Sequence, residues 1–314
     1  MLGLLVRRLL VSIPLLLVVS FLVFGLIVLV PGDPAVALAG QNPDPAQIEA
    51  VRERLGLDDP FLVQYWNWLA GALQGDLGTS LFTSQTVWTA ILARLPATLS
   101  LAFLALGLAI VLGVTVGSIA GLRPGTWLDR VATVGASVGV AVPYFWVGMI
   151  LVLLFALQNP LLPAVGYVPL TENPVAWFQH LILPATALAL APAAVIARQT
   201  RASVSTVMSE DYVRTATAKG LSPVQVVGKH ALKNAALPVV TVFGIEANRL
   251  IGGTVVIEQL FALPGIGQLA YQGVFSRDFP IVQGVVLVAA VMVLFINIVV
   301  DVSYGYFNPR IRQS

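Results

Sequence analysis

Residues 97–121 read ATLSLAFLALGLAIVLGVTVGSIAG, a run of 25 residues without one charged side chain. As a helix with a rise of about 1.5 Å per residue, this run is longer than the roughly 30 Å hydrocarbon core of a bilayer. Pro96 precedes it, and proline is well tolerated in the first turn of a helix, where the N–H groups have no intrahelical partner. The stretch therefore predicts a transmembrane helix.

The rest of the chain repeats this pattern. Six apolar runs are long enough to span, at about 9–30, 97–121, 131–157, 179–197, 237–257 and 281–302. The 314 residues are 58% hydrophobic and 10% charged, against about a quarter charged in soluble domains. We therefore expect an all-α polytopic membrane protein with one transmembrane domain over residues 1–314. Prolines inside the runs predict kinks, at Pro143, Pro184 and Pro192.

The first apolar run has two interpretations. Arg7 and Arg8 precede it, and residues 37–39 offer a small-residue cleavage pattern, as in a secretory signal peptide. The run is about 22 residues long, however, which exceeds the roughly 7–15 residues of a signal-peptide core. We expect an uncleaved first transmembrane helix.

Lysine and arginine are unevenly distributed between alternate loops, and this bias orients the chain. With a cytoplasmic N-terminus, the outer segments hold only Arg52, Arg54, Arg94 and Arg277. The inner segments then hold Arg7, Arg8, Arg123, Arg130, Arg198, Arg201, Arg214, Lys219, Lys229, Lys233, Arg310 and Arg312. Six spans therefore place both termini in the cytoplasm. Residues 32–95 become an extracytoplasmic loop, and residues 198–236 a cytoplasmic one.

The extracytoplasmic loop contains two segments with helical character. Residues Asp44–Leu55 place Pro45 at a first helical position and Gly56 just past the end, which predicts a short helix. The next stretch, Phe61–Leu69, is apolar and contains one tyrosine and two tryptophans. Such residues favour the membrane interface, so this stretch either lies against the outer leaflet or packs on neighbouring spans.

The sequence lacks the common signatures of catalysis. It has no cysteine, and its two histidines, His180 and His230, are far apart, so we expect no metal site. It has no G-x4-G-K-S/T loop for nucleotide phosphates, no G-x-S-x-G elbow and no H-E-x-x-H pair. We expect no catalytic residue and no cofactor in this chain, so any energy for transport comes from elsewhere.

A polar island, Arg198–Asn234, interrupts the apolar sequence and holds six of the 17 lysines and arginines. Glu210–Lys219 can form a short helix that Gly220 ends, and Ser222 with Pro223 can begin a second. Small residues at the elbow would let a partner's backbone approach closely, and the cations would face an acidic rim. The alternative is a solvated loop whose cations only enforce the topology.

The island resembles the coupling loop, called the EAA loop, of permease subunits in bacterial ABC importers. Arg214-Thr215-Ala216 occupies the position of the family's E-A-A triplet, Gly220 that of its glycine, and Leu237-Pro238 that of its downstream Leu-Pro. Arginine replaces the glutamate, and the gap to Leu-Pro is longer than the general consensus. Both departures are similar to the peptide-transport branch of the family.

Other stretches resemble the B-type subunits of dipeptide and oligopeptide (also nickel and glutathione) permeases along nearly the whole chain. They are residues 1–40 with Leu-Val-Pro-Gly-Asp-Pro-Ala at 29–35, Gln74-Gly-Asp-Leu-Gly-Thr-Ser80, Arg94-Leu-Pro-Ala-Thr-Leu-Ser100, Trp127-Leu-Asp-Arg130, Val142-Pro-Tyr-Phe-Trp-Val-Gly148, Gly252-Gly-Thr-Val-Val-Ile-Glu258 and Leu263-Pro-Gly-Ile-Gly267. Seven motifs in order, on a six-span layout, are a specific match.

The resemblance implies the partners and the mechanism. A homologous C-type permease subunit would complete the path in the bacterial inner membrane. Two cytoplasmic ATPases would bind ATP and Mg, and an extracytoplasmic binding protein would deliver a peptide. Contact with an ATPase would fall on Arg214, Thr215, Ala216, Ala218, Lys219, Gly220 and Leu221. An outer gate or docking role would fall on Glu258, Pro264 and Gly265, although Glu258 is equally explained as a boundary acid in water.

Three polar residues fall inside the fifth run: Glu246, Asn248 and Arg249. A charge at membrane depth costs roughly 2.5–3.5 kcal/mol on insertion scales, so such residues face a cavity or one another. Residues 246 and 249 are three apart and share a helical face, which favours a local ion pair. We expect them to line the path of a zwitterionic peptide; the alternative is a structural pair at a subunit interface.

Two other functions compete with an ATP-driven permease. An ion-coupled secondary transporter would favour repeats and broken helices at midplane, and no repeat is visible. A membrane scaffold without transport would bind no ATPase through the island. Nucleic acid is not an expected partner, because the cations are interspersed with acids and make a poor track for phosphates. The substrate itself stays open among dipeptides, longer peptides, glutathione, nickel chelates and sugars, which related permeases handle.

Overall fold

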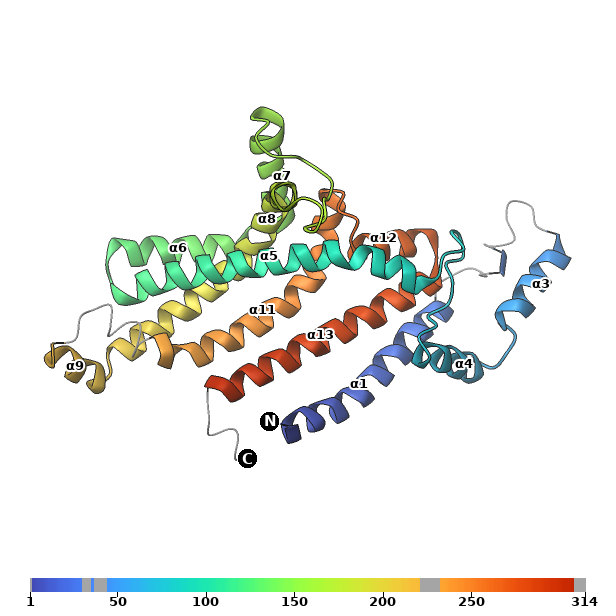
Figure 1. Ribbon diagram of the computed structural model, residues 1–314, viewed down its shortest axis with the longest axis horizontal. Coiled ribbons are helices and arrows are strands. Elements are labelled where there is room, and N and C mark those ends of the chain that lie inside the picture. The colour runs from blue at the N-terminus through green and yellow to red at the C-terminus, as the bar shows by residue number, and fades with distance from the viewer. Residues whose placement is uncertain (1, 30–34, 37–43, 221–231, 308–314) are drawn as a thin grey trace. The chain divides into compact units, whose positions relative to one another are not determined.

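The computed structural model describes residues 2–29, 35–36, 44–220 and 232–307 (Figure 1). Within them, the regular structure is helical apart from one isolated bridge between Thr79 and Thr86. The helices are α1 (Leu2–Leu29), α3 (Pro45–Leu55), α4 (Phe61–Leu73), α5 (Val87–Leu122), α6 (Trp127–Ala141), α7 (Tyr144–Val152) with a π-helical continuation (Leu153–Gln158), α8 (Pro174–Met208), α9 (Asp211–Ala218), α11 (Leu232–Leu260), α12 (Ile266–Ser276) and α13 (Phe279–Phe307).

Among the described residues, four helical segments are long and apolar enough to cross a membrane. They are α5, α8, Pro238–Leu260 of α11 and Phe279–Ser303 of α13. The bent pair of α6 and α7 makes a fifth if it counts as one span, and α1 contributes a shorter apolar segment, Leu10–Gly25. The expected all-helical chain with several apolar helices is therefore confirmed, and four of the described helices, or five with the bent pair, are candidate spans by length and composition.

The third expected span, 131–157, is not straight. α6 ends at Ala141, and α7 leaves at an angle of 97° after Pro143 (Figure 1). A residue before proline is pushed toward extended backbone, and Val142 has φ −80° and ψ 127°. The kink predicted at Pro143 is thus confirmed as a break, whereas α8 continues as a helix through Pro184 and Pro192.

Two compact units make up the chain and are described separately. The first comprises the described parts of Met1–Leu5, Ala97–Pro264 and Phe295–Ser314. α8 lies at its centre. The buried share of the most apolar 18-residue stretch is 67% in α8 and 22% in α5. α6, α7 and α11 all pack on α8. The core is apolar and mostly aliphatic, and it includes Leu101, Leu181, Leu188, Ile257 and Phe261.

α5 approaches α8 very closely within this unit. A Cβ atom placed on Gly117 would lie 2.4 Å from the carbonyl oxygen of Ala197, and one on Gly121 would lie 2.8 Å from that of Arg201. Real side chains do not tolerate such distances, so glycine is required where the two backbones meet. These glycines bring the end of α5 against the last third of α8.

The second unit comprises the described parts of Val6–Pro96 and Gly265–Leu294. Its core joins the start of α5 to α12 and the start of α13 through Val87, Ile91, Leu269 and Ile281. The short helix predicted after Asp44 is confirmed as α3, with the Asp44 side chain accepting the Ala46 N–H at 3.4 Å and Gly56 closing the helix at φ 61°.

α4 packs on α1 in the second unit, as one of the two interpretations of Phe61–Leu69 predicted. The rings of Phe61 and Tyr65 contact those of Phe21 and Phe24, with centroids 5.2–5.8 Å apart. The Tyr65 hydroxyl also lies 2.9 Å from the Ser20 hydroxyl. The opposite face of α4 is exposed.

Candidate coupling and translocation sites

The polar island begins as a direct continuation of the central helix. α8 runs on to Met208, and α9 follows after two residues. The helix predicted at Glu210–Lys219 is confirmed as α9, and Gly220 follows it with φ 82°, in the left-handed region that favours glycine. Leu221 and most of the second predicted helix, from Ser222 toward Asn234, fall within 221–231, outside the described residues.

α9 has an inner and an outer face. Val213 and Ala216 are buried against Val207 and Met208 at the end of α8. Ala216 therefore anchors α9 to α8 rather than forming part of its outer face.

The other described candidates of the coupling loop lie on the outside. Thr215, Ala218, Lys219 and Gly220 are exposed, while the side chain of Arg214 is not among those described. The Thr215 hydroxyl donates to the Asp211 carbonyl at 2.9 Å, one turn back along α9. A small, polar and accessible ridge remains at the end of the helix.

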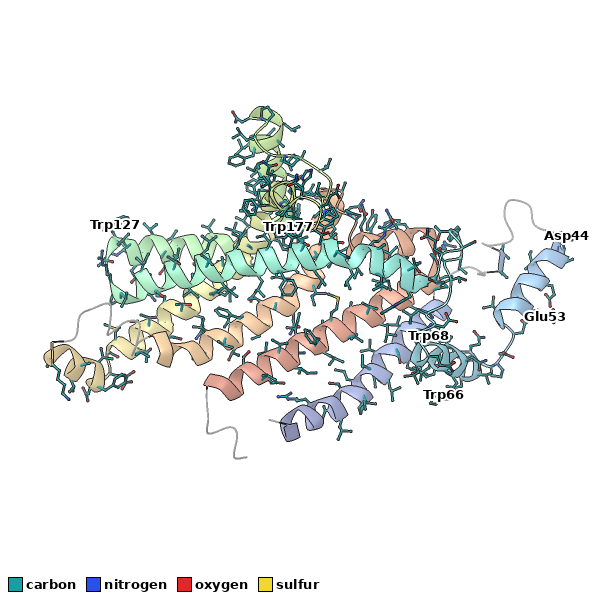
Figure 2. The ribbon with its side chains drawn as sticks, in the orientation of Figure 1. Asp44, Glu53, Trp66, Trp68, Trp127 and Trp177 are labelled. Carbon is teal, nitrogen blue, oxygen red and sulfur yellow. The ribbon has the colours of Figure 1, made fainter. Side chains whose placement is uncertain are left out.

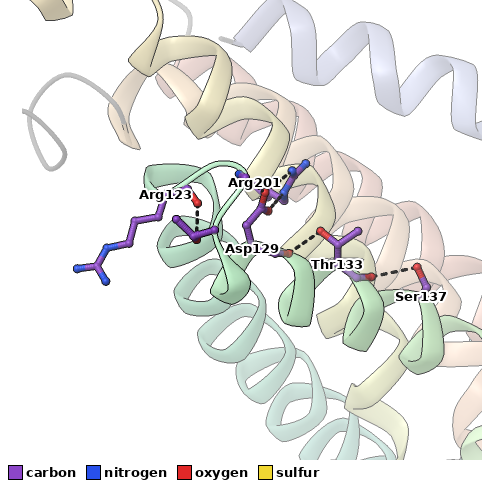
Figure 3. Close-up of polar contacts among 7 residues, drawn as sticks. Arg123, Asp129, Thr133, Ser137 and Arg201 are labelled. Atoms are coloured by element: carbon purple, nitrogen blue, oxygen red, sulfur yellow. Dashed lines mark hydrogen bonds and ion pairs between the residues drawn. The ribbon is translucent and has the colours of Figure 1, made fainter.

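An ion pair that the sequence did not predict lies near the C-terminal end of α8 (Figure 3). Asp129, at the start of α6, is 4% exposed and accepts two hydrogen bonds from Arg201 of α8. Arg201 Nη2 lies 2.8 Å from Asp129 Oδ2, and Arg201 Nε bonds Oδ1. The Gly125 N–H donates to Oδ2 at 2.9 Å. The only sequence signal was Trp127-Leu-Asp-Arg130, which did not identify a partner.

The polar residues expected in the fifth run lie on α11. Arg249 Nη1 lies 2.8 Å from Glu246 Oε1, so the predicted local ion pair forms. Its two ends differ in environment, because the Glu246 side chain is 4% exposed and that of Arg249 is 66% exposed. The pair therefore presents a cation at the chain's own surface while its carboxylate stays inside.

Asn248 extends this cluster to α13. Its Nδ2 donates to Oδ1 of Asn297 at 2.7 Å. The Asn248 Oδ1 is buried and has no hydrogen-bond partner among the described residues. Asn297 was not predicted as a site residue, since a lone asparagine in an apolar run gives no sign of a partner 49 positions away.

Glu258 is not a boundary acid in water. It is fully buried near the end of α11, and its Oε1 accepts the Thr98 hydroxyl at 2.7 Å. Its carbonyl accepts the Leu263 N–H at 2.9 Å, which helps to form the turn that ends the helix. Of the other two outer candidates, Pro264 is exposed and Gly265 is buried. Glu258 thus lacks the accessible surface that direct docking requires.

Comparison with known proteins gives two matching family profiles. Residues 113–313 match the family described as "Binding-protein-dependent transport system inner membrane component". Residues 1–102 match the family described as "Binding-prot-dependent transport system membrane comp, N-term". Together the two matches cover nearly the whole chain.

Full-length relatives support the same relationship. A Brucella abortus protein assigned by name to a peptide transport system, as its permease, is 43% identical over 100% of both chains. The glutathione transport system permease protein of Escherichia coli is 42% identical, also over 100% of both.

A solved structure shares the fold. It is of the MetNI methionine ABC transporter in an inward-facing conformation, and it matches with a TM-score of 0.57. The match covers 68% of this chain and 93% of that one at 20% identity. At this identity the likeness concerns the fold alone.

Proposed function

Since this chain belongs to the family of binding-protein-dependent transport system inner membrane components, we propose that it is the permease subunit of an ATP-driven importer of dipeptides or oligopeptides. The observation that carries the peptide substrate is the full-length identity of 42–43% to permeases named for peptide and glutathione transport. The chain forms half of the translocation path, and a homologous C-type subunit forms the other half.

α9 is the contact for a cytoplasmic ATPase in this proposal. Three of the four residues on its exposed ridge are small, so a groove can close around them, and the fourth, Lys219, is a cation; the ridge consists of Thr215, Ala218, Lys219 and Gly220. Ala216 and Val213 fix the ridge to α8, the most buried helix of the first unit. Arg214 and Leu221 complete the contact as the family motif implies. ATP and Mg are held by the two ATPases, and this chain carries no cofactor.

The peptide path runs past the polar cluster on α11. Glu246, Asn248 and Arg249, joined by Asn297 of α13, place both signs of charge and two amides within apolar helices. A zwitterionic peptide carries an ammonium and a carboxylate, so it gains from both signs. The exposed Arg249 is the residue best placed to meet the peptide carboxylate.

The topology follows from the charge bias. Six spans, with α1 and the bent α6–α7 pair each counted as one, put both termini and residues 198–236 in the cytoplasm of a bacterial cell. Residues 32–95 then lie outside, where α4 rests against the outer leaflet. An extracytoplasmic binding protein docks on this side, with Pro264 as an accessible contact and Glu258 and Gly265 as buried supports of its turn.

Transport in a defined system tests the proposal. The chain is co-purified with the permease, ATPases and binding protein encoded beside it and reconstituted into proteoliposomes. We expect ATP-dependent uptake of a labelled peptide that continues when an ionophore collapses the proton gradient. Uptake driven by the gradient without ATP would establish a secondary transporter instead. If no ATPase is recovered even after crosslinking from Lys219, a scaffold replaces the importer.

A further inference from the structure

The buried carboxylate of Asp129 joins three segments of the first unit, near the C-terminal end of α8. It accepts the Arg201 guanidinium of α8 and the N–H of Gly125 in the α5–α6 turn, and it belongs to α6 itself. A planar guanidinium bonded to both oxygens of one carboxylate fixes orientation as well as distance. The contact therefore restricts rotation of α8 against the turn, which a single hydrogen bond would not do.

The α5–α6 turn is ordered around this carboxylate. The Thr126 hydroxyl donates to the Arg123 carbonyl at 2.7 Å, and the Thr133 hydroxyl donates to the Asp129 carbonyl at 2.8 Å (Figure 3). The end of α5 is held at the same level, because Gly121 lies against the Arg201 carbonyl. α5, α6 and α8 thus meet at one cross-section, at Arg201.

Arg201, where the three helices meet, is close to α9 along the chain. Arg201 and Met208 are seven residues apart in one helix, which is about 10 Å at 1.5 Å per residue. Met208 and Val207 are the residues against which Val213 and Ala216 of α9 are buried. A continuous set of packed and hydrogen-bonded groups therefore leads from α9 through the last turns of α8 to Asp129.

We propose that the Asp129–Arg201 ion pair is a positioning element of coupling, which transmits movement of α9 to α5 and α6 together with α8. The inference rests on the proposed function, in which an ATPase moves α9. Without the pair, α8 turns or slides against the α5–α6 turn, and the movement of α9 is lost there. The pair touches neither peptide nor ATPase, and it acts through the helices that it joins.

Distance measurements test the mechanical step in the assembled complex. The chain has no cysteine, so spin labels at Trp127→Cys and Thr206→Cys report α6 against the end of α8 alone. Both native residues are exposed and outside the pair. We expect Asp129→Asn to broaden the distance distribution, and the exchange Asp129→Arg with Arg201→Asp to narrow it again. Arg198→Gln, which removes an exposed cation one turn earlier on α8, is the matched control and leaves the distribution unchanged.

Transport supplies the functional readout. Asp129→Asn should lower peptide import by about 2- to 30-fold, the range for residues that couple distant sites. ATP hydrolysis and recovery of the ATPases should stay unchanged, so that hydrolysis becomes uncoupled. Arg201→Lys, which keeps the charge but loses the planar double contact, gives an intermediate loss and serves if Asp129→Asn does not assemble.

Each result decides the inference. Broadened distances, uncoupled hydrolysis and rescue by the exchange support it. An unchanged distance distribution or unchanged import in Asp129→Asn overturns it. It is also overturned if none of the variants assembles, the charge exchange included. If the unmodified chain imports no peptide with ATP, the proposed function fails instead, and this is seen before any variant is made.

Discussion

At the scale of single residues, the chain places opposite charges in pairs of two kinds. Glu246 and Arg249 are three positions apart on one helix, so helical geometry alone predicted their contact. Asp129 and Arg201 are 72 positions apart, and only the packing of α6 on α8 brings them together. Local pairs can therefore be predicted from sequence, whereas the pair that joins two helices could not.

Substitution of Arg249 distinguishes a role in the peptide path from a role in assembly of the complex. Arg249→Met removes the exposed cation and leaves the Glu246 carboxylate buried without its partner guanidinium. We expect peptide uptake to be abolished while the complex still assembles, measured by uptake in proteoliposomes and by recovery of the C-type subunit and ATPases. Arg123→Met, which removes an exposed cation from the α5–α6 turn, should leave uptake near that of the parent. Loss of assembly in Arg249→Met would instead make the pair structural.

At the scale of elements, the apolar runs predicted helices, but their path depends on side chains that sequence patterns do not place. Pro143 predicted a kink, but it predicted neither the 97° angle nor the packing of α7 on α8. Gly117 looks like any other small residue of α5, although it is one of the points where α5 meets the α8 backbone. The structure thus distinguishes glycines that have the same appearance in the sequence.

Two glycines of α5 should respond very differently to valine. In Gly117→Val the new side chain meets the Ala197 carbonyl, so we expect destabilisation of about 1–3 kcal/mol or more from overpacking. In Gly107→Val nothing lies within 4 Å of the new Cβ, and the helix propensity change is the same. The stabilities of the two variants should differ when the protein is unfolded in detergent by heat or by denaturant. Equal stability of both would show that α5 does not pack on α8 at Gly117.

α4 packs on α1, as one of the two interpretations of its sequence predicted, and its outer face is left exposed. Its inner face packs on α1, while Leu62, Trp66 and Leu73 on its outer face are 58%, 62% and 81% exposed. Trp66 is labelled on α4 in Figure 2. We expect the outer face to lie in lipid at the membrane interface. A bimane label at Trp66→Cys should be quenched by spin-labelled lipids. The same label at Glu53→Cys of α3, which is exposed, should be quenched only by aqueous iodide. Iodide quenching at both positions would place α4 in water or beneath a protein partner that admits water.

At the scale of the whole molecule, the number of spans decides the sides on which the coupling and docking surfaces lie. The apolar runs predicted six spans, and the described helices give four, or five with the bent pair. The difference concerns only α1 and α6–α7. α1 has a short apolar segment within the described residues, and α6–α7 is broken by a proline. Hydropathy alone cannot distinguish a bent span from a re-entrant one, because both bury similar residues.

Labelling of single cysteines in intact cells resolves these two segments separately. If α1 spans, Gly3→Cys and Glu53→Cys lie on opposite sides, so an impermeant maleimide should label only position 53 before permeabilisation. If α6–α7 spans, Pro124→Cys should stay protected and Glu172→Cys should react. Lys219→Cys, in the coupling loop, should share the protection of positions 3 and 124. Equal reactivity at the two positions of a pair would show that the segment between them does not cross the membrane. Removal of only one of the two would also put the termini on opposite sides of the membrane, because the number of spans would then be odd.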